Sequence, residues 1–105
     1  MNRPTPIRLS ADARQVIQDT VVELFGPEAG VAVFGSRADP TARGGDIDLL
    51  VRLPSPVPER ERKALELVAR LQMRLGDQPI DVLVIDPQTP LAPIHRQALA
   101  TGVFL

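Results

Sequence analysis

Apolar residues recur at helical spacing in two long segments of the chain. The first segment follows Ser10, a residue type that caps helices, and it ends at Gly26-Pro27. The second begins near Pro58, after a proline-rich stretch, and ends at Gly76. Both segments are therefore predicted helices. The expected buried stripe of the second helix consists of Leu65, Val68, Leu71 and Leu75.

Runs of strand-forming residues lie between and after these helices. The sequence predicts strands at 31–35, 47–53 and 79–86. The third run is continuously apolar at its centre, which is typical of a strand covered on at least one face. A last short helix is expected within 89–101. The order helix, strand, strand, helix, strand, helix predicts a small two-layer α/β sandwich with a mixed sheet, in a single domain spanning residues 1–105.

Composition narrows the functional classes. The chain has 105 residues and a formal net charge of −1, so it lacks the basic excess of a general nucleic-acid or membrane-surface binder. It has no Trp, no Tyr and only three Phe, so it offers hardly any aromatic surface for stacking bases. A chain this short often gains buried surface from a partner subunit, which includes a second copy of itself.

Cysteine usage and the amino terminus indicate the compartment. The absence of cysteine excludes disulfides and thiolate chemistry, which suits a reducing environment. The first residues, MNRPTPIRL, lack the apolar run of a signal peptide, and no stretch is long enough to span a membrane. A cytoplasmic location is therefore expected.

Two aspartates stand at the start of the second predicted strand. Asp46 and Asp48 are separated by Ile47 alone, so their side chains project in the same direction. Two adjacent carboxylates repel each other, and a divalent cation removes that cost. Asp81 opens the next strand, and a neighbouring strand would bring its carboxylate beside the first two. Three carboxylates would form a site for two Mg²⁺ ions.

A polar loop before these aspartates has the residue types that bind phosphate. Gly35 allows the backbone to approach a ligand closely, and the Ser36 hydroxyl can donate to phosphate oxygens. Arg37 and Arg43 lie in the same loop and either neutralise phosphate or remain solvated loop charges. The loop thus combines candidate phosphate binding at one end with candidate metal binding at the other.

The stretch GSRADPTARGGDIDLLV resembles the signature of the minimal nucleotidyltransferases, a prokaryotic branch of the DNA polymerase beta-like superfamily. That signature is a Gly-Ser pair, about ten residues, an acidic–apolar–acidic triplet and a later acidic residue. The matching positions here are Gly35, Ser36, Asp46, Asp48 and Asp81. This chain departs from many members in having Gly44-Gly45 where they carry proline and serine, and its loop is one residue shorter.

The resemblance implies a polymerase beta-like nucleotidyltransferase fold and transfer of AMP from ATP with Mg²⁺. It implies that Asp46 and Asp48 hold metal ions, that Asp81 assists the attacking hydroxyl, and that Gly35 and Ser36 hold the triphosphate. Small members are commonly paired with a HEPN-domain ribonuclease toxin, which they inactivate by adenylylating one of its tyrosines. This chain has no tyrosine, so such an acceptor would come from a partner.

Other interpretations of the chain and of single residues remain open at this point. One alternative function is that of a binding module that neutralises its partner by occlusion alone. Another is the transfer of a nucleotide to a small molecule such as an aminoglycoside. Asp39 and Asp86 are expected turn residues beside prolines, and His95 is an expected surface residue of the last helix.

Overall fold

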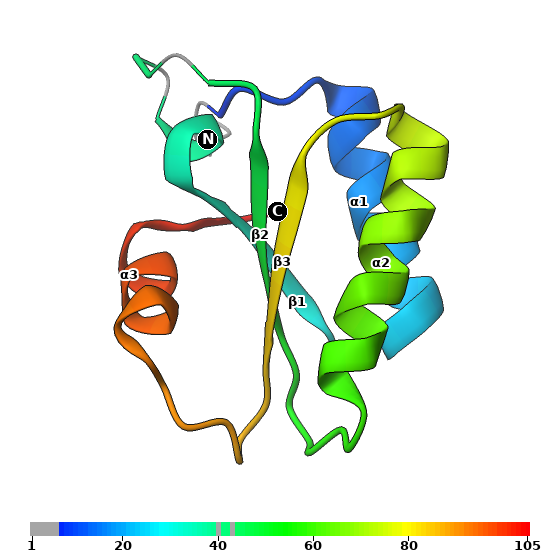
Figure 1. The fold of residues 1–105 in the computed structure, drawn as a ribbon, viewed down its shortest axis with the longest axis vertical. Helices are drawn as coiled ribbons and strands as arrows, with labels where there is room; N and C mark the ends of the chain where they lie inside the picture. Colours follow the sequence, from blue (N-terminus) through cyan, green and yellow to red (C-terminus); the bar gives the residue numbers. More distant parts are fainter. Residues whose placement is uncertain (1–6, 40, 43) are drawn as a thin grey trace, which may run out of the picture.

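The structure is a computed structural model that describes residues 7–39, 41–42 and 44–105. Helices and strands alternate along the described chain (Figure 1). None of the helices in those ranges is long and apolar enough to cross a membrane. The elements are α1 (Ala11–Phe25), β1 (Gly30–Phe34), the 3₁₀ turn η1 (Gly35–Ala38), β2 (Ile47–Arg52), α2 (Arg60–Leu75), β3 (Ile80–Ile85), α3 (Pro93–Thr101) and β4 (Val103–Phe104).

The strands form one mixed sheet in the order β3-β2-β1-β4. Strand β1 pairs antiparallel with β2 and β4, whereas β2 and β3 are parallel. Helices α1 and α2 lie on one face of the sheet, and the short α3 lies on the other (Figure 1). The predicted α/β class and mixed sheet are therefore confirmed. Strand β4 was not predicted, because two residues give no alternation to recognise.

Alternate residues of each strand pack into two different apolar clusters. Ile47, Leu49 and Val51 of β2 belong to the larger cluster, which includes buried residues of α1 and α2. Leu50 belongs to the smaller cluster, which includes Ala98 of α3. Side chains two apart on a strand share a face. Polar residues in phase with Leu50 therefore project towards the side of the sheet that α3 covers.

The buried stripe of α2 differs from the predicted one at one position. Leu67 and Leu71 are fully buried, with Val68 and Leu75 packed beside them, but the side chain of Leu65 is 73% exposed. Each helical residue turns about 100° from the last, so Leu65 lies about 120° away from Leu71 around the helix. The prediction that Leu65 is a core residue was wrong, because Leu67 occupies the inward position.

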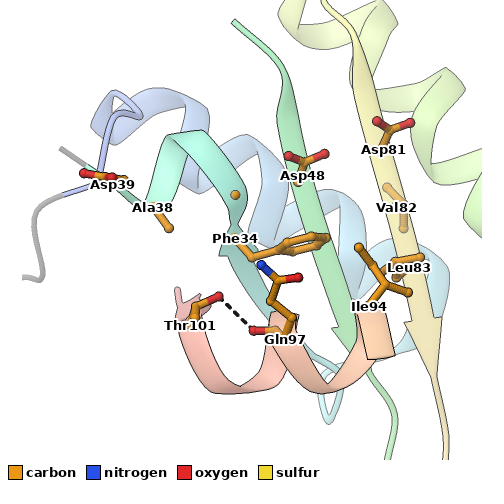
Figure 2. Close-up of a pocket in the computed structure, with 11 residues that line it drawn as sticks. Phe34, Ala38, Asp39, Asp48, Asp81, Val82, Leu83, Ile94, Gln97 and Thr101 are labelled. Atoms are coloured by element: carbon orange, nitrogen blue, oxygen red, sulfur yellow. Dashed lines mark hydrogen bonds between the residues drawn. The ribbon is translucent and has the colours of Figure 1, made fainter. Parts of the chain in front are cut away.

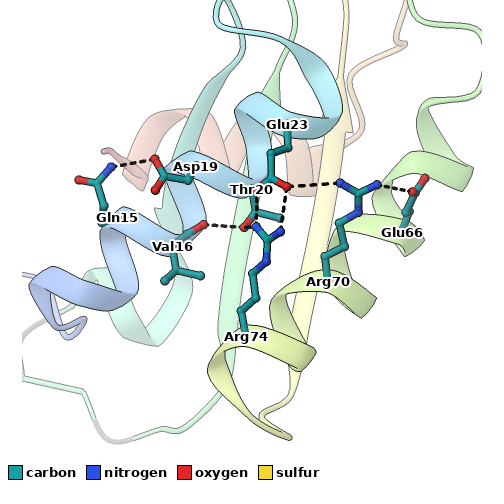
Figure 3. A network of polar contacts seen from close by, with 8 residues as sticks. All are labelled: Gln15, Val16, Asp19, Thr20, Glu23, Glu66, Arg70 and Arg74. Atoms are coloured by element: carbon teal, nitrogen blue, oxygen red, sulfur yellow. Dashed lines mark hydrogen bonds and ion pairs between the residues drawn. The ribbon is translucent and has the colours of Figure 1, made fainter.

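Polar contacts connect α1 to α2 (Figure 3). Arg74 donates to the buried hydroxyl of Thr20 at 2.7 Å and pairs with both carboxylate oxygens of Glu23. Arg70 bridges Glu23, at 3.7 Å, and Glu66, at 2.9 Å. A bidentate arginine pair fixes geometry as well as charge. These contacts hold the two helices in register behind the sheet.

Candidate active site

Two predicted site residues meet where β2 and β3 run in parallel. The strand register places Asp48 opposite Asp81. Asp48 is in phase with Leu50, so both carboxylates lie on the face of the sheet that α3 covers (Figure 2). Asp48 is half-buried and Asp81 is exposed. The parallel pairing thus brings together two carboxylates that are far apart in the sequence.

Gly35 brings the polar loop against the Asp48 carboxylate. Its φ angle is +68°, in the left-handed region that favours glycine. A Cβ atom added there would overlap the Asp48 carboxylate. Any larger residue would therefore strain the backbone and displace Asp48. This close approach explains why glycine is needed at the point where β1 ends.

A cleft of about 710 Å³ opens beside this contact. Its polar end holds Asp48 and Asp81, and Ile94 and Gln97 of α3 point towards them from the opposite wall (Figure 2). Its other lining residues are Phe34, Gly35, Ala38, Asp39, Val82, Leu83 and Thr101. The cleft combines an acidic end with an apolar floor, which is the usual character of a small-molecule site.

The negative charges of the carboxylates near the cleft repel one another. Partial burial raises the pKa of Asp48, and the nearby charges of Asp81 and Asp46 raise it further. Each of these causes disfavours the ionised form, and a bound cation would reverse the effect of the neighbouring charges. The arrangement therefore favours a positively charged ligand between Asp48 and Asp81.

The donor chemistry fits Mg²⁺, which is usually held by one or two carboxylates together with waters and substrate phosphates. Asp46 is exposed at the entry to β2 and is not among the residues that line the cleft. Within residues 7–39, 41–42 and 44–105, no three acidic or histidine side chains are close enough to hold a metal ion together. The Asp48–Asp81 pair is thus formed, and metal binding by all three aspartates stays a prediction.

The predicted phosphate-binding residues of the loop differ in their surroundings. Ser36 lies next to Gly35 in η1 and is half-buried. The Arg37 guanidinium donates to the backbone carbonyls of Arg8, at 2.7 Å, and Gly45, at 3.0 Å, so it braces the loop. Arg43 lies outside the described residues. Phosphate contact by Arg37 and Arg43 therefore stays a prediction.

The predicted turn residues have structural partners. Asp39 accepts hydrogen bonds from the backbone and the hydroxyl of Thr41, at 2.8 and 2.7 Å, which confirms it as a turn residue. Asp86 accepts from two backbone amides and directly follows β3, which also confirms a turn. His95 is half-buried, and its Nδ1 accepts from the backbone N–H of Ala92 at the start of α3.

Sequence reasoning missed three residues around the cleft. Arg8 contacts the polar loop across 28 sequence positions, and nothing in its neighbourhood marks it as part of a site. Ile94 and Gln97 line the cleft because α3 folds back over the sheet. Their spacing of three places them on one face of a helix, which was the available signal.

Solved structures of other proteins have the same fold as this chain. A solved structure of a protein from Shewanella oneidensis has a TM-score of 0.60 at 18% identity, covering 92% of this chain and 71% of that one. A structure of a toxin–antitoxin with AMP-PNP has a TM-score of 0.56 at 21% identity, covering 83% and 70%. A mutant toxin–antitoxin MntA–HpeT has a TM-score of 0.56 at 18% identity, with the same coverage.

These structures share the fold of this chain. No match was found among curated proteins. The sequence model of the nucleotidyltransferase domain matches residues 15–100, which include the Gly-Ser pair and all three aspartates of the predicted signature. That match covers most of the chain and spans β1, β2 and β3, the strands that build the cleft. The chain belongs to the nucleotidyltransferase domain family.

Proposed function

We propose that this protein transfers AMP from ATP to a tyrosine hydroxyl of a HEPN-domain ribonuclease toxin, and that it acts as the antitoxin of that partner. The observation that carries the proposal is the cleft in which Asp48 lies beside Asp81 on the neighbouring strand and against Gly35 of the loop. Paired carboxylates beside a phosphate-binding loop are the groups that nucleotidyl transfer requires.

Proteins of similar fold support the choice of nucleotide and partner. One is described as a toxin–antitoxin with AMP-PNP, a non-hydrolysable analogue of ATP. Another is described as the toxin–antitoxin MntA–HpeT carrying two aspartate-to-glutamate substitutions. The present chain has no tyrosine, so it cannot itself supply that acceptor. An adenine nucleotide and a toxin protein are therefore the proposed substrates.

In the proposed reaction, the acceptor oxygen attacks the α-phosphorus of ATP. A new phosphorus–oxygen bond forms as the bond to the oxygen bridging the α- and β-phosphates breaks, and pyrophosphate leaves. Asp81 takes the proton from the acceptor hydroxyl. Gly35 and Ser36 hold the triphosphate, and Asp46, Asp48 and Asp81 would hold Mg²⁺. Bound Mg²⁺ neutralises phosphate charge.

Labelled ATP tests this proposal directly. The protein is incubated with Mg²⁺, ATP labelled at the α-phosphate and the purified product of the adjacent gene. We expect label on a tyrosine of that partner, and we expect its loss in the Asp46→Ala/Asp48→Ala double variant. Asp77→Ala, which removes an exposed carboxylate outside the cleft, is the matched control. An unlabelled partner, with wild-type protein that binds nucleotide, would contradict adenylylation.

Inhibition by complex formation alone is the second candidate function. It is favoured by two apolar side chains on the outer surface of α2, Leu65 and Met73, which are 73% and 86% exposed. Exposed apolar side chains of this size are available to pack against another protein. The Asp46→Ala/Asp48→Ala variant separates the two functions, because occlusion predicts full inhibition of the toxin without ATP.

A further inference from the structure

Arg8 joins the two ends of the polar loop that borders the cleft. Its guanidinium donates to the carbonyl oxygen of Ser36 from Nε, at 3.3 Å, and from Nη2, at 3.1 Å. The same Nη2 donates to the carbonyl of Gly44 at 2.9 Å. Ser36 stands at the start of the loop and Gly44 near its end. One side chain from the segment before α1 therefore spans the loop.

Hydrogen bonds also run from the loop back to the segment that carries Arg8, through Arg37. The backbone N–H of Arg8 donates to the carbonyl of Arg37 at 2.8 Å, and the Arg37 guanidinium donates back to the Arg8 carbonyl at 2.7 Å. Arg37 also donates to the carbonyl of Gly45 at 3.0 Å. The two arginines thus close a ring of hydrogen bonds around residues that lie in no strand.

This ring fixes positions that matter for the proposed site. A Cβ atom at Gly44 would lie 2.7 Å from the Ser36 hydroxyl oxygen, so the two loop ends pack tightly at this point. Asp46 follows Gly44 by two residues and leads into β2. A change in the distance between Ser36 and Gly44 would therefore move the predicted phosphate end of the site relative to its metal end.

We propose that Arg8 is a positioning residue, which holds the Gly35-Ser36 turn and the end of the loop at the spacing that nucleotide binding requires. This inference rests on the proposed function. Its basis is geometric, because a guanidinium can donate to two carbonyls at once in a fixed plane. A loop held in its binding arrangement before the ligand arrives loses less entropy when the ligand binds.

Nucleotide affinity tests the proposal in three variants. Binding of AMP-PNP with Mg²⁺ is measured by calorimetry for the wild type, Arg8→Ala, Arg8→Lys and the control Arg62→Ala. Arg62 is 73% exposed and pairs with Glu59, so its loss makes the same charge change on a surface of α2. We expect Kd to rise about tenfold in Arg8→Ala, with unfolding midpoints in urea that match the control.

Lysine distinguishes geometry from charge. A lysine at position 8 keeps the positive charge but lacks the planar fork, so we expect Arg8→Lys to bind nearly as weakly as Arg8→Ala. Full recovery of affinity in Arg8→Lys would overturn the positioning role, because it would show that charge alone is needed. An Arg8→Ala affinity equal to that of the wild type would overturn it as well.

A second measurement keeps this result separate from the transfer proposal. Amide hydrogen exchange of the loop, without nucleotide, is compared between the wild type and Arg8→Ala. We expect faster exchange in the segment around Ser36 and Gly44 only in the variant, and unchanged exchange would overturn the proposal. If the wild type binds AMP-PNP but labels no partner, the transfer proposal fails while the Arg8 measurements still decide the positioning role.

Discussion

Asp48 is the residue at which stability and proposed function conflict most clearly. It is half-buried, it faces Asp81 across the strand pair, and it lies against Gly35. Burial and the charges of Asp81 and Asp46 raise its pKa. A carboxyl whose pKa is raised in the folded state stabilises the protein when protonated, and that contribution is lost as the pH rises through the raised pKa. The ionised site therefore costs folding free energy.

Replacement of Asp48 by asparagine tests this conflict. In metal-free buffer at neutral pH, we expect Asp48→Asn to unfold at a higher urea concentration than the wild type, because it removes a half-buried charge among like charges. The difference should vanish below a pH of about 4, where the wild-type carboxyl is also neutral. Nucleotidyl transfer should fall by on the order of a hundredfold or more.

The same measurement on Asp77→Asn is the control, because that carboxylate is exposed and lies outside the cleft. Its unfolding midpoint should differ little from that of the wild type at either pH. If Asp48→Asn is less stable than the wild type at neutral pH, then hydrogen bonds of the carboxylate outweigh its repulsion, and the electrostatic account of the cleft is wrong.

At the level of elements, the parallel pairing of β2 and β3 builds the site, and the helical layer behind the sheet holds that pairing in place. Ile47 and Leu49 of β2 pack on the side of α1 and α2, while Asp48 between them faces the cleft. Loss of packing behind the sheet would therefore disturb the carboxylate pair in front of it. The stripe of α2 is the part of that layer that the sequence pattern described incompletely.

Two leucines of α2 provide a matched test of the corrected stripe. Leu67 is fully buried and Leu65 is 73% exposed, although they are two positions apart. We expect Leu67→Ala to lower the free energy of unfolding by about 2–5 kcal/mol, because it leaves a cavity. Leu65→Ala should change it by no more than about 0.5 kcal/mol. Equal losses in urea titrations of the two variants would show that Leu65 is also a core residue.

The sequence was sufficient for elements with strong local signals. Ser10 was predicted to start a helix, and its hydroxyl oxygen accepts from the N–H of Ala13 at 3.0 Å. The carboxylates Asp48 and Asp81 were predicted to meet because their strands were expected to be neighbours. Arg8 was not predicted, because its role depends on contacts with a loop that local patterns do not place. Leu65 was misplaced because Leu65 and Leu67 are both apolar residues of α2, and the sequence pattern alone did not decide which of them faces the sheet.

At the level of the whole molecule, Asp86 connects three parts of the chain at the far end of the sheet. Its side chain is almost fully buried and accepts from the N–H of Val57, in the segment after β2, at 2.9 Å. It also accepts from the N–H of Gln88 at 2.8 Å and lies 3.6 Å from the guanidinium of Arg60 in α2. Removal of its charge would therefore loosen β3, α2 and the proline-rich segment together.

This connection predicts how the stability of the molecule depends on acid. The hydrogen bond from Val57 is the main cause that lowers the pKa of Asp86, with further lowering by Gln88, Arg60 and Thr89. A carboxyl whose pKa is lowered in the folded state stabilises the protein above its ordinary pKa, and that contribution is lost as the pH falls through the lowered value.

We expect Asp86→Asn to unfold at lower urea concentration than the wild type at pH about 7. The difference between the urea midpoints of the variant and the wild type should narrow below a pH of about 4, because the Asp86 carboxylate of the wild type then loses its charge as well. A gap of constant size across urea titrations at both pH values would show that hydrogen-bond geometry at this position, and not its charge, stabilises the junction.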